Sequence, residues 1–166
     1  GRSPGVLEPA MALQRAAGMP VSVFWHWWHG CAYDTGFPEY LPPREGETPF
    51  AAALERAHAQ DVHALVYMNQ RLWGMTTASW TNENAAAFAV KGLDGTVRPE
   101  TYNTFTKLPC ATMCLATDFW RGKYARVASE AFHRWTTALP SPMPALSITI
   151  WLSGRAATLD AVAWVR

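Results

Sequence analysis

The sequence predicts an α/β fold in which parallel strands are flanked by helices. Residues 20–25 and 62–68 are apolar segments with the β-branched and aromatic composition of buried strands, covered on both faces. A helix is predicted between them, and short connections join the three elements. Because a strand, a crossover helix and a second strand with this spacing form a βαβ unit, the two strands should run parallel in one sheet.

The helices are predicted from their composition, caps and apolar spacing. The first covers residues 8–17, "EPAMALQRAA", and ends at Gly18, which suits a left-handed C-terminal cap. The second has Thr48 as its N-cap and Pro49 as its first helical residue. Its apolar face, at helical spacing, consists of Phe50, Ala53, Leu54 and Ala57.

Residues 69–116 separate the second strand from the next convincing helix, and connections of this length tend to be functional. Within them we expect a short helix from Thr81, a turn centred on Asp94 and Gly95, and a short strand in residues 109–116. The following helix has Thr117 as its N-cap. Its apolar face consists of Trp120, Tyr124, Val127 and Ala131.

The composition is that of a globular protein with one sizeable core. The chain has 166 residues, of which 49% are apolar and 16% charged, and its formal net charge is +1. Its basic residues are scattered, so nucleic acid is not an expected partner. No apolar stretch approaches the roughly 20 residues of a membrane-spanning helix, and the first residues lack a signal-peptide core. We therefore expect a soluble protein whose compartment is unknown.

Neither a metal nor a cofactor is predicted. Cys31, Cys110 and Cys114 are odd in number and form no CxxC pair, so they indicate small buried apolar groups. His26 and His29 lie three residues apart on an extended segment and should therefore point to opposite faces.

Polar and aromatic residues concentrate directly after both predicted strands. The first strand continues into "WHWWHGCAYDTGF" and the second into "NQRLWGMTTASWTNEN". Ligands of parallel α/β folds bind at the carboxyl ends of the strands, and indole faces beside hydrogen-bonding groups suit sugar rings. The predicted carbohydrate-binding residues are Trp25, His26, Trp28, Asn69, Gln70, Arg71, Trp73 and Trp80.

Each of these residues also has a structural interpretation. Tryptophans at positions 25, 27 and 28 cannot all face the core of a strand, so at least one contacts ligand or packs beneath a loop. The polar residues 69–71 bind ligand or anchor the loop, and Trp73 and Trp80 line a cleft or hold the loop in place. Among the acids, Asp34 and Glu83 are catalytic candidates by their position at the loop-rich end.

Three segments carry a family resemblance: "VFWHWWHGCAYDTGFPEYLPPREG", "HALVYMNQRLWGMTTASW" and "NAAAFAVKGLDGTVRPETYNTFTKLPCATMCLATDFWRGKYARVASEAF". Over about residues 8–132 the chain resembles a TIM-barrel family of glycoside-hydrolase-like proteins, known mainly as a domain of unknown function. The resemblance implies that residues 1–133 form a partial (β/α)8 barrel. It also implies a retaining mechanism with two carboxylates about 5 Å apart.

The tail departs from the pattern that the resemblance implies. A strand ending in a nucleophilic acid is expected after Phe132, but prolines stand at 140, 142 and 144, and the one acid of the tail is Asp160. The strand-like "LSITIWL" is followed by Ser153 and Gly154. Residues 134–166 are therefore predicted to be a divergent tail, either a variant ending or unrelated, out-of-frame sequence.

Together these features predict a fragment of a glycoside-hydrolase-like, carbohydrate-active protein that lacks the full catalytic acid pair. The alternative is a non-catalytic carbohydrate-binding or interaction module that uses the same tryptophans. Because a partial barrel exposes sheet edges and an apolar face, we also expect the chain to self-associate.

Overall fold

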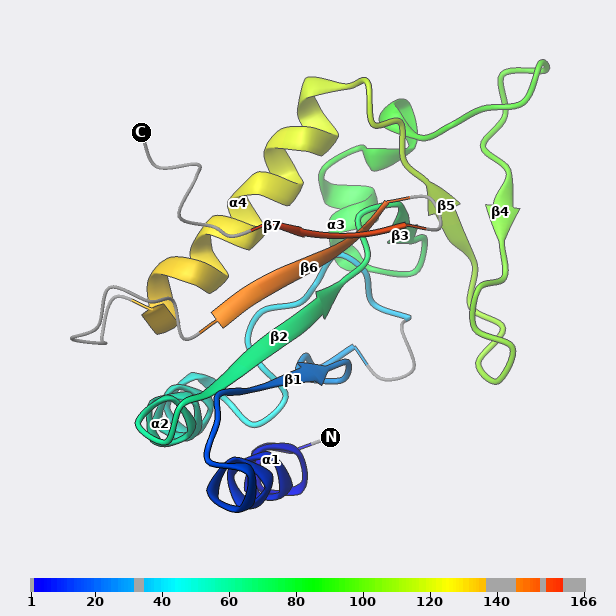
Figure 1. Ribbon diagram of the computed structural model, residues 1–166. Coiled ribbons are helices and arrows are strands. Elements are labelled where there is room, and N and C mark those ends of the chain that lie inside the picture. The colour runs from blue at the N-terminus through cyan, green and yellow to red at the C-terminus, as the bar shows by residue number, and fades with distance from the viewer. Residues whose placement is uncertain (1, 32–34, 137–145, 153–154, 160–166) are drawn as a thin grey trace.

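A parallel sheet lies at the centre of the computed structural model, which describes residues 2–31, 35–136, 146–152 and 155–159 (Figure 1). Strands β1 (Val21–Trp25), β2 (Val62–Met68) and β6 (Leu146–Leu152) run parallel, and β7 (Arg155–Leu159) pairs antiparallel with β6. The strand order is β1-β2-β6-β7. The predicted α/β class with parallel strands is confirmed.

Helix α2 (Glu47–His58) connects β1 to β2 and completes the predicted βαβ unit. Val21 pairs with Val62 and Trp25 with Val66, so the two strands are in register over the whole of β1. Helix α4 (Asp118–Thr136) precedes β6, whose first residue, Leu146, pairs with Ala64 of β2. The strand expected from "LSITIWL" is therefore present beside β2.

Some of the helix ends lie where the local sequence predicts them, and others do not. Helix α1 (Ser3–Ala17) starts earlier than predicted but ends as expected at Gly18, whose φ of 66° is left-handed. Helix α2 starts before Thr48, so the prediction of Thr48 as N-cap is wrong. The chain enters α2 through Gly46 at a φ of 87°, which places Pro49 in the first turn, where its missing N–H breaks no helical bond.

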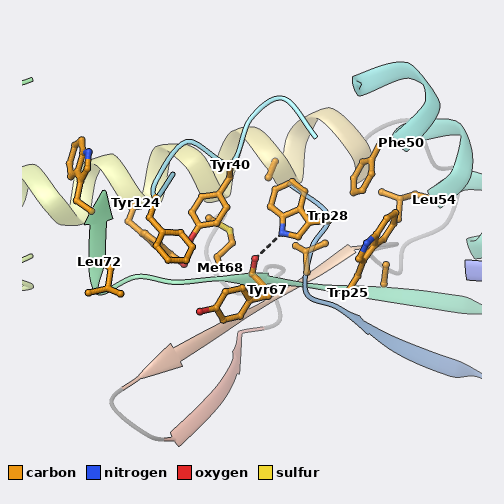
Figure 2. Packing of buried hydrophobic residues seen from close by; sticks show 14 of the residues in the cluster. Trp25, Trp28, Tyr40, Phe50, Leu54, Tyr67, Met68, Leu72 and Tyr124 are labelled. Atoms are coloured by element: carbon orange, nitrogen blue, oxygen red, sulfur yellow. Dashed lines mark hydrogen bonds between the residues drawn. The ribbon is translucent and has the colours of Figure 1, made fainter. Parts of the chain in front are cut away.

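One face of the sheet packs against the helices and forms the core. Val62, Ala64 and Val66 of β2 are buried there, and the predicted apolar face of α2 is buried against them. Figure 2 shows Phe50 and Leu54 of α2 beside Trp25 at the end of β1.

The opposite face of the sheet, called the open face below, is less covered. Ser22 and Phe24 of β1 are exposed on it, and His63 and Leu65 of β2 are half-buried. Because side chains alternate along a strand, these residues point away from the helices. The prediction that β1 is covered on both faces is wrong for the described residues.

Residues 69–116 form a small subdomain that follows the carboxyl end of β2. Strands β3 (Leu72–Gly74), β5 (Cys110–Thr112) and β4 (Pro99–Glu100) make an antiparallel sheet in that order (Figure 1). Strand β5 and the turn at Gly95, with a φ of 77°, are where the sequence predicts them.

The helices of this subdomain differ from the prediction. Helix α3 (Ala78–Asn82) starts before Thr81 because the hydroxyl of Thr77 accepts the N–H of Trp80 and caps it earlier. A short 3₁₀ helix, Ala85–Phe88, follows.

Helix α4 buries the face that its spacing predicts. Trp120 and Ala131 are fully buried, and Tyr124 is 8% exposed. The helix runs through residue 133, and the domain boundary expected there stays a prediction. Prolines 140, 142 and 144 lie outside the described residues. The three cysteines are free thiols, with Cys31 and Cys110 buried and Cys114 half-buried.

Candidate functional site

Aromatic rings gather at the carboxyl ends of β1 and β2 on the open face. The ring of His26 stacks on Tyr67, with centroids 4.2 Å apart and planes 18° apart. Phe24 lies 6.3 Å from both rings, and Trp27 meets His26 edge-on at 5.8 Å. Phe24 is 48% and Trp27 40% exposed. We call these four residues the edge cluster.

Asn69 ties the edge cluster to the chain that follows β2. Its side-chain amide donates to the Tyr67 hydroxyl at 3.3 Å, and its Oδ1 accepts the N–H groups of Arg71 and Leu72. The Tyr40 hydroxyl accepts the Asn69 N–H and donates to the Asn69 carbonyl at 3.0 Å. Burial raises the pKa of Tyr40, so its hydroxyl stays protonated.

A cavity of about 600 Å³ opens in the subdomain after β2. Its charged lining residues are Arg71, Lys91, Arg98 and Glu100. Its other lining residues are Val90, Gly92, Leu93 and Thr112. We call it the cationic cavity, because its lining carries three cations and one carboxylate.

Glu100 is engaged by two neighbours on the wall of the cationic cavity. Arg71 Nη1 lies 3.0 Å from Glu100 Oε2 and 3.3 Å from Thr112 Oγ1. The Thr112 hydroxyl donates to the same carboxylate. Burial, and after it the charge of Glu100, raises the pKa of Cys110, the residue opposite Glu100 in β5. On this wall the Glu100 carboxylate is therefore engaged by Arg71 and Thr112, and the Arg71 guanidinium is held in place by the same contacts.

Trp25 and Trp28, predicted to contact carbohydrate, are core residues. Their exposed fractions are 1% and 0%, and both rings pack on Phe50. Trp28 Nε1 donates to the Tyr67 carbonyl at 2.8 Å, and its indole stacks on Tyr40 (Figure 2). In this structure both side chains therefore belong to the core, and their contact with a ligand stays a prediction.

Trp73 and Trp80 lie in the packing between the subdomain and α4. Trp73 is fully buried, stacks on Phe119 at 6.0 Å and contacts Trp80 edge-on at 6.4 Å. Lys123 Nζ lies 5.2 Å from the centre of the Trp73 ring and pairs with the carboxylate of Glu83. The burial of Trp73 contradicts its predicted ligand contact, and Glu83 is held in an ion pair.

The remaining predicted residues divide between anchoring and surface roles. Gln70 accepts the indole N–H of Trp120 at its backbone carbonyl, at 2.7 Å. His26 belongs to the edge cluster, and Arg71 lines the cationic cavity. Asp34 lies outside the described residues.

Several residues of these two surfaces escape the sequence prediction. Phe24 and Trp27 stand in the same aromatic run as the predicted residues. Strand alternation, which places Phe24 on the same face as His26, could have selected Phe24, but it gives no signal for Trp27, which follows the end of β1. Lys91 and Arg98 flank the predicted turn, whose hairpin pairing of Lys91 with Val97 brings its two arms together.

Neither a metal site nor a membrane-spanning helix is found among the described residues. No three histidine, cysteine or acidic side chains among them gather closely enough to hold a metal ion. No helix in the same part of the chain combines the length and apolar character needed to cross a membrane.

Comparison with known proteins finds a curated relative that is named as an enzyme. It is the "Putative glycoside hydrolase" of Bacteroides thetaiotaomicron, 28% identical over 115 residues. The match covers 69% of this chain but 16% of that protein, so the chain spans about a sixth of the relative's length.

Solved structures share the fold at lower identity. An α-N-acetylgalactosaminidase of Bifidobacterium bifidum, in complex with GalNAc, matches 74% of this chain and 20% of its own, with a TM-score of 0.58 and 20% identity. A maltogenic α-amylase of Thermotoga neapolitana matches 78% and 32%, with a TM-score of 0.54 and 11% identity. These likenesses concern the fold, and the relatives support a carbohydrate-active family.

The family comparison confirms the resemblance seen in the sequence. The family described as "Domain of unknown function (DUF6259)" matches residues 1–138, which is most of the chain and includes every described element before β6. The chain belongs to this family.

Proposed function

We propose that this chain is the carbohydrate-binding part of a glycoside-hydrolase-like barrel, and that a saccharide lies against the edge cluster. The observation that carries the proposal is a cluster of aromatic rings at the carboxyl ends of two parallel strands, in which Phe24 and Trp27 are exposed beside the stacked pair His26 and Tyr67. Sugars stack their C–H faces on such rings, and the His26 ring nitrogens are hydrogen-bonding groups of the kind that sugar hydroxyls require.

The barrel itself is part of this proposal. Three parallel strands in the order β1-β2-β6, connected through helices, have the handed β-α repeat from which a (β/α)8 barrel is built. In such a barrel the open face would be the interior face of the strands. The match covers 20% of one solved neighbour and 32% of the other, so the remaining strands would come from a longer protein.

Binding is tested by isothermal titration of the chain with galactose and N-acetylgalactosamine. We expect saturable binding, and Trp27→Ala should weaken it about fivefold to tenfold because one stacking ring is lost. Phe105→Ala, which removes an 84% exposed ring outside the edge cluster, is the matched control and should bind like the parent. Unchanged affinity in Trp27→Ala, or no binding of either sugar, would refute the proposal.

A non-catalytic binding module is the second candidate, and the ion pair of Glu83 with Lys123 favours it. A carboxylate whose oxygen is held in an ion pair is not positioned to act on a glycosidic bond. We therefore expect the chain to bind sugar without hydrolysing nitrophenyl α-glycosides. Turnover that disappears in Asp34→Asn or Glu83→Gln would instead establish a hydrolase in which that acid acts, and turnover that survives both changes would remove them as catalysts.

A further inference from the structure

We propose that the cationic cavity binds the carboxylate or sulfate group of an acidic saccharide. This inference rests on the proposed carbohydrate function and names its substrate class. The juxtaposition that carries it is an excess of two positive charges in a cavity whose lining begins at Arg71, which lies two residues after Asn69 and donates its N–H to the Asn69 side chain.

The charges of the cavity are not balanced from within. Arg71 is matched by Glu100, whose oxygens also accept the Thr112 hydroxyl. No carboxylate among the described residues lies within 4.0 Å of the side-chain nitrogens of Lys91 or Arg98. A bound anion would therefore meet two cations that form no ion pair with a described carboxylate, with the Asp94 carboxylate as their neighbour: Asp94 Oδ1 and Arg98 Nε both lie 2.8 Å from the place of a Cβ on Gly92. Hydrogen bonds from such cations to an anion are charge-assisted.

Local structure holds these two cations on one wall. Lys91 pairs with Val97 across the hairpin, and the N–H of Gly92 donates to the Thr96 carbonyl at 2.9 Å. At the turn, the carboxylate of Asp94 accepts the N–H and hydroxyl of Thr96, and these bonds lower its pKa. The nearest acid of the hairpin is thereby occupied with the turn.

Gly92 gives the Arg98 guanidinium its place in the cavity. A Cβ added at Gly92 would lie 2.8 Å from Arg98 Nε and 3.2 Å from Arg98 Nη2, so the side chain lies directly over the glycine backbone. Any other residue at this position displaces the guanidinium. The absence of a side chain at Gly92 is therefore a requirement for the present position of Arg98.

The rest of the lining suits the body of a sugar. Val90 and Leu93 are exposed apolar side chains on the same cavity, and they offer contact to the C–H groups of a ring. The volume of about 600 Å³ lies within the usual range for small-ligand sites, which is about 300 to 1,000 Å³. One acidic pyranose with part of a neighbouring residue fits such a space.

The test compares D-galacturonate with D-galactose, which differ in a carboxylate at one carbon. By isothermal titration of the full chain at low salt, galacturonate should bind about tenfold more tightly, and added NaCl should reduce the difference. Lys91→Gln and Arg98→Gln should each remove most of this preference. Arg126→Gln, at an exposed position on α4, is the control and should keep the preference.

Gly92→Ala keeps every charge, but its methyl group would crowd both the Arg98 guanidinium and the Asp94 carboxylate, so it tests whether the placement of these groups matters as well as their charge. It should lower the preference for galacturonate about as much as Arg98→Gln does. Galactose 6-sulfate and inorganic sulfate complete the series. Tight binding of the sulfated sugar supports the inference, whereas free sulfate binding as tightly as either acidic sugar overturns it in favour of a general anion site.

The two proposals fail in different ways. If galactose binds but galacturonate binds no better, the inference fails and the carbohydrate function stands. If neither sugar binds, and Trp27→Ala therefore has nothing to weaken, the proposed function fails and the inference with it.

Discussion

His29 is a buried imidazole, fully enclosed by Trp28, Phe37 and Tyr40. Burial is the main cause that lowers its pKa to about 4, and the charges of His26 and Arg44 lower it further. The folded protein therefore keeps this ring neutral at pH values where the unfolded chain, with a pKa near 6.5, binds a proton.

The resulting pH dependence of stability has a definite sign. Because the folded pKa is the lower one, the contribution is present above about pH 6.5 and is lost as the pH falls toward 4, by about 3 kcal/mol in full. Urea unfolding at pH 7 and at pH 4.5 should show a smaller loss in His29→Phe than in the parent. An equal loss in both proteins would contradict the expectation.

Neighbouring tryptophans should behave differently when they are truncated. Trp28→Ala removes a fully buried ring and the partner of the Tyr67 carbonyl, and should lower the free energy of unfolding by about 3 to 5 kcal/mol. Trp27→Ala removes a ring that is 40% exposed and should cost less than about 1.5 kcal/mol. Thermal unfolding of the two variants measures both losses of stability. Similar losses would contradict the description of Trp28 as buried and Trp27 as exposed.

At the scale of elements, Gly74 fixes how β3 meets the loop after β1. A Cβ at this position would lie 2.6 Å from the Thr35 carbonyl oxygen, and the Gly74 N–H donates to the Phe37 carbonyl at 2.8 Å. Gly74→Ala should cost about 1 to 3 kcal/mol because backbone must move.

Gly122 of α4 is the matched control for Gly74. A Cβ there meets nothing within 4 Å, so Gly122→Ala should raise stability by up to about 1 kcal/mol through helix propensity. Equilibrium unfolding in urea measures both variants. A stable Gly74→Ala protein would show that the loop and β3 are not packed as the structure has them.

These elements also show what local sequence can predict. The buried face of α2 and the strand 62–68 follow from periodicity, because each is set by residues a few positions apart. Periodicity does not predict that Trp27 is exposed while Trp28 is buried. Trp28 is directed inward by its hydrogen bond to the Tyr67 carbonyl in β2 and by the bridge of His29 with Pro43, both of which are contacts with distant residues. The cationic cavity likewise needs the β3–β5 pairing, which brings Arg71 to Thr112.

For the whole molecule, the open face predicts self-association. Phe24 on the edge strand β1 is 48% exposed, and in the proposed barrel it would face other strands. Sedimentation of the chain should show concentration-dependent association, weakened about tenfold in Phe24→Ser because one large apolar contact is lost. Leu13→Ser, at a 57% exposed site on α1, should have no effect. A chain that stays monomeric at all concentrations would contradict this prediction.

The central claim is that a saccharide binds at the carboxyl edge of the parallel sheet. The most direct measurement is hydrogen exchange of the full chain, with and without saturating amounts of the sugar that binds most tightly. We predict slower exchange in residues 24–28 and 67–71, which hold the edge cluster and the turn at Asn69. Slower exchange confined to α1 and α2, or no change anywhere under saturation, would contradict the claim.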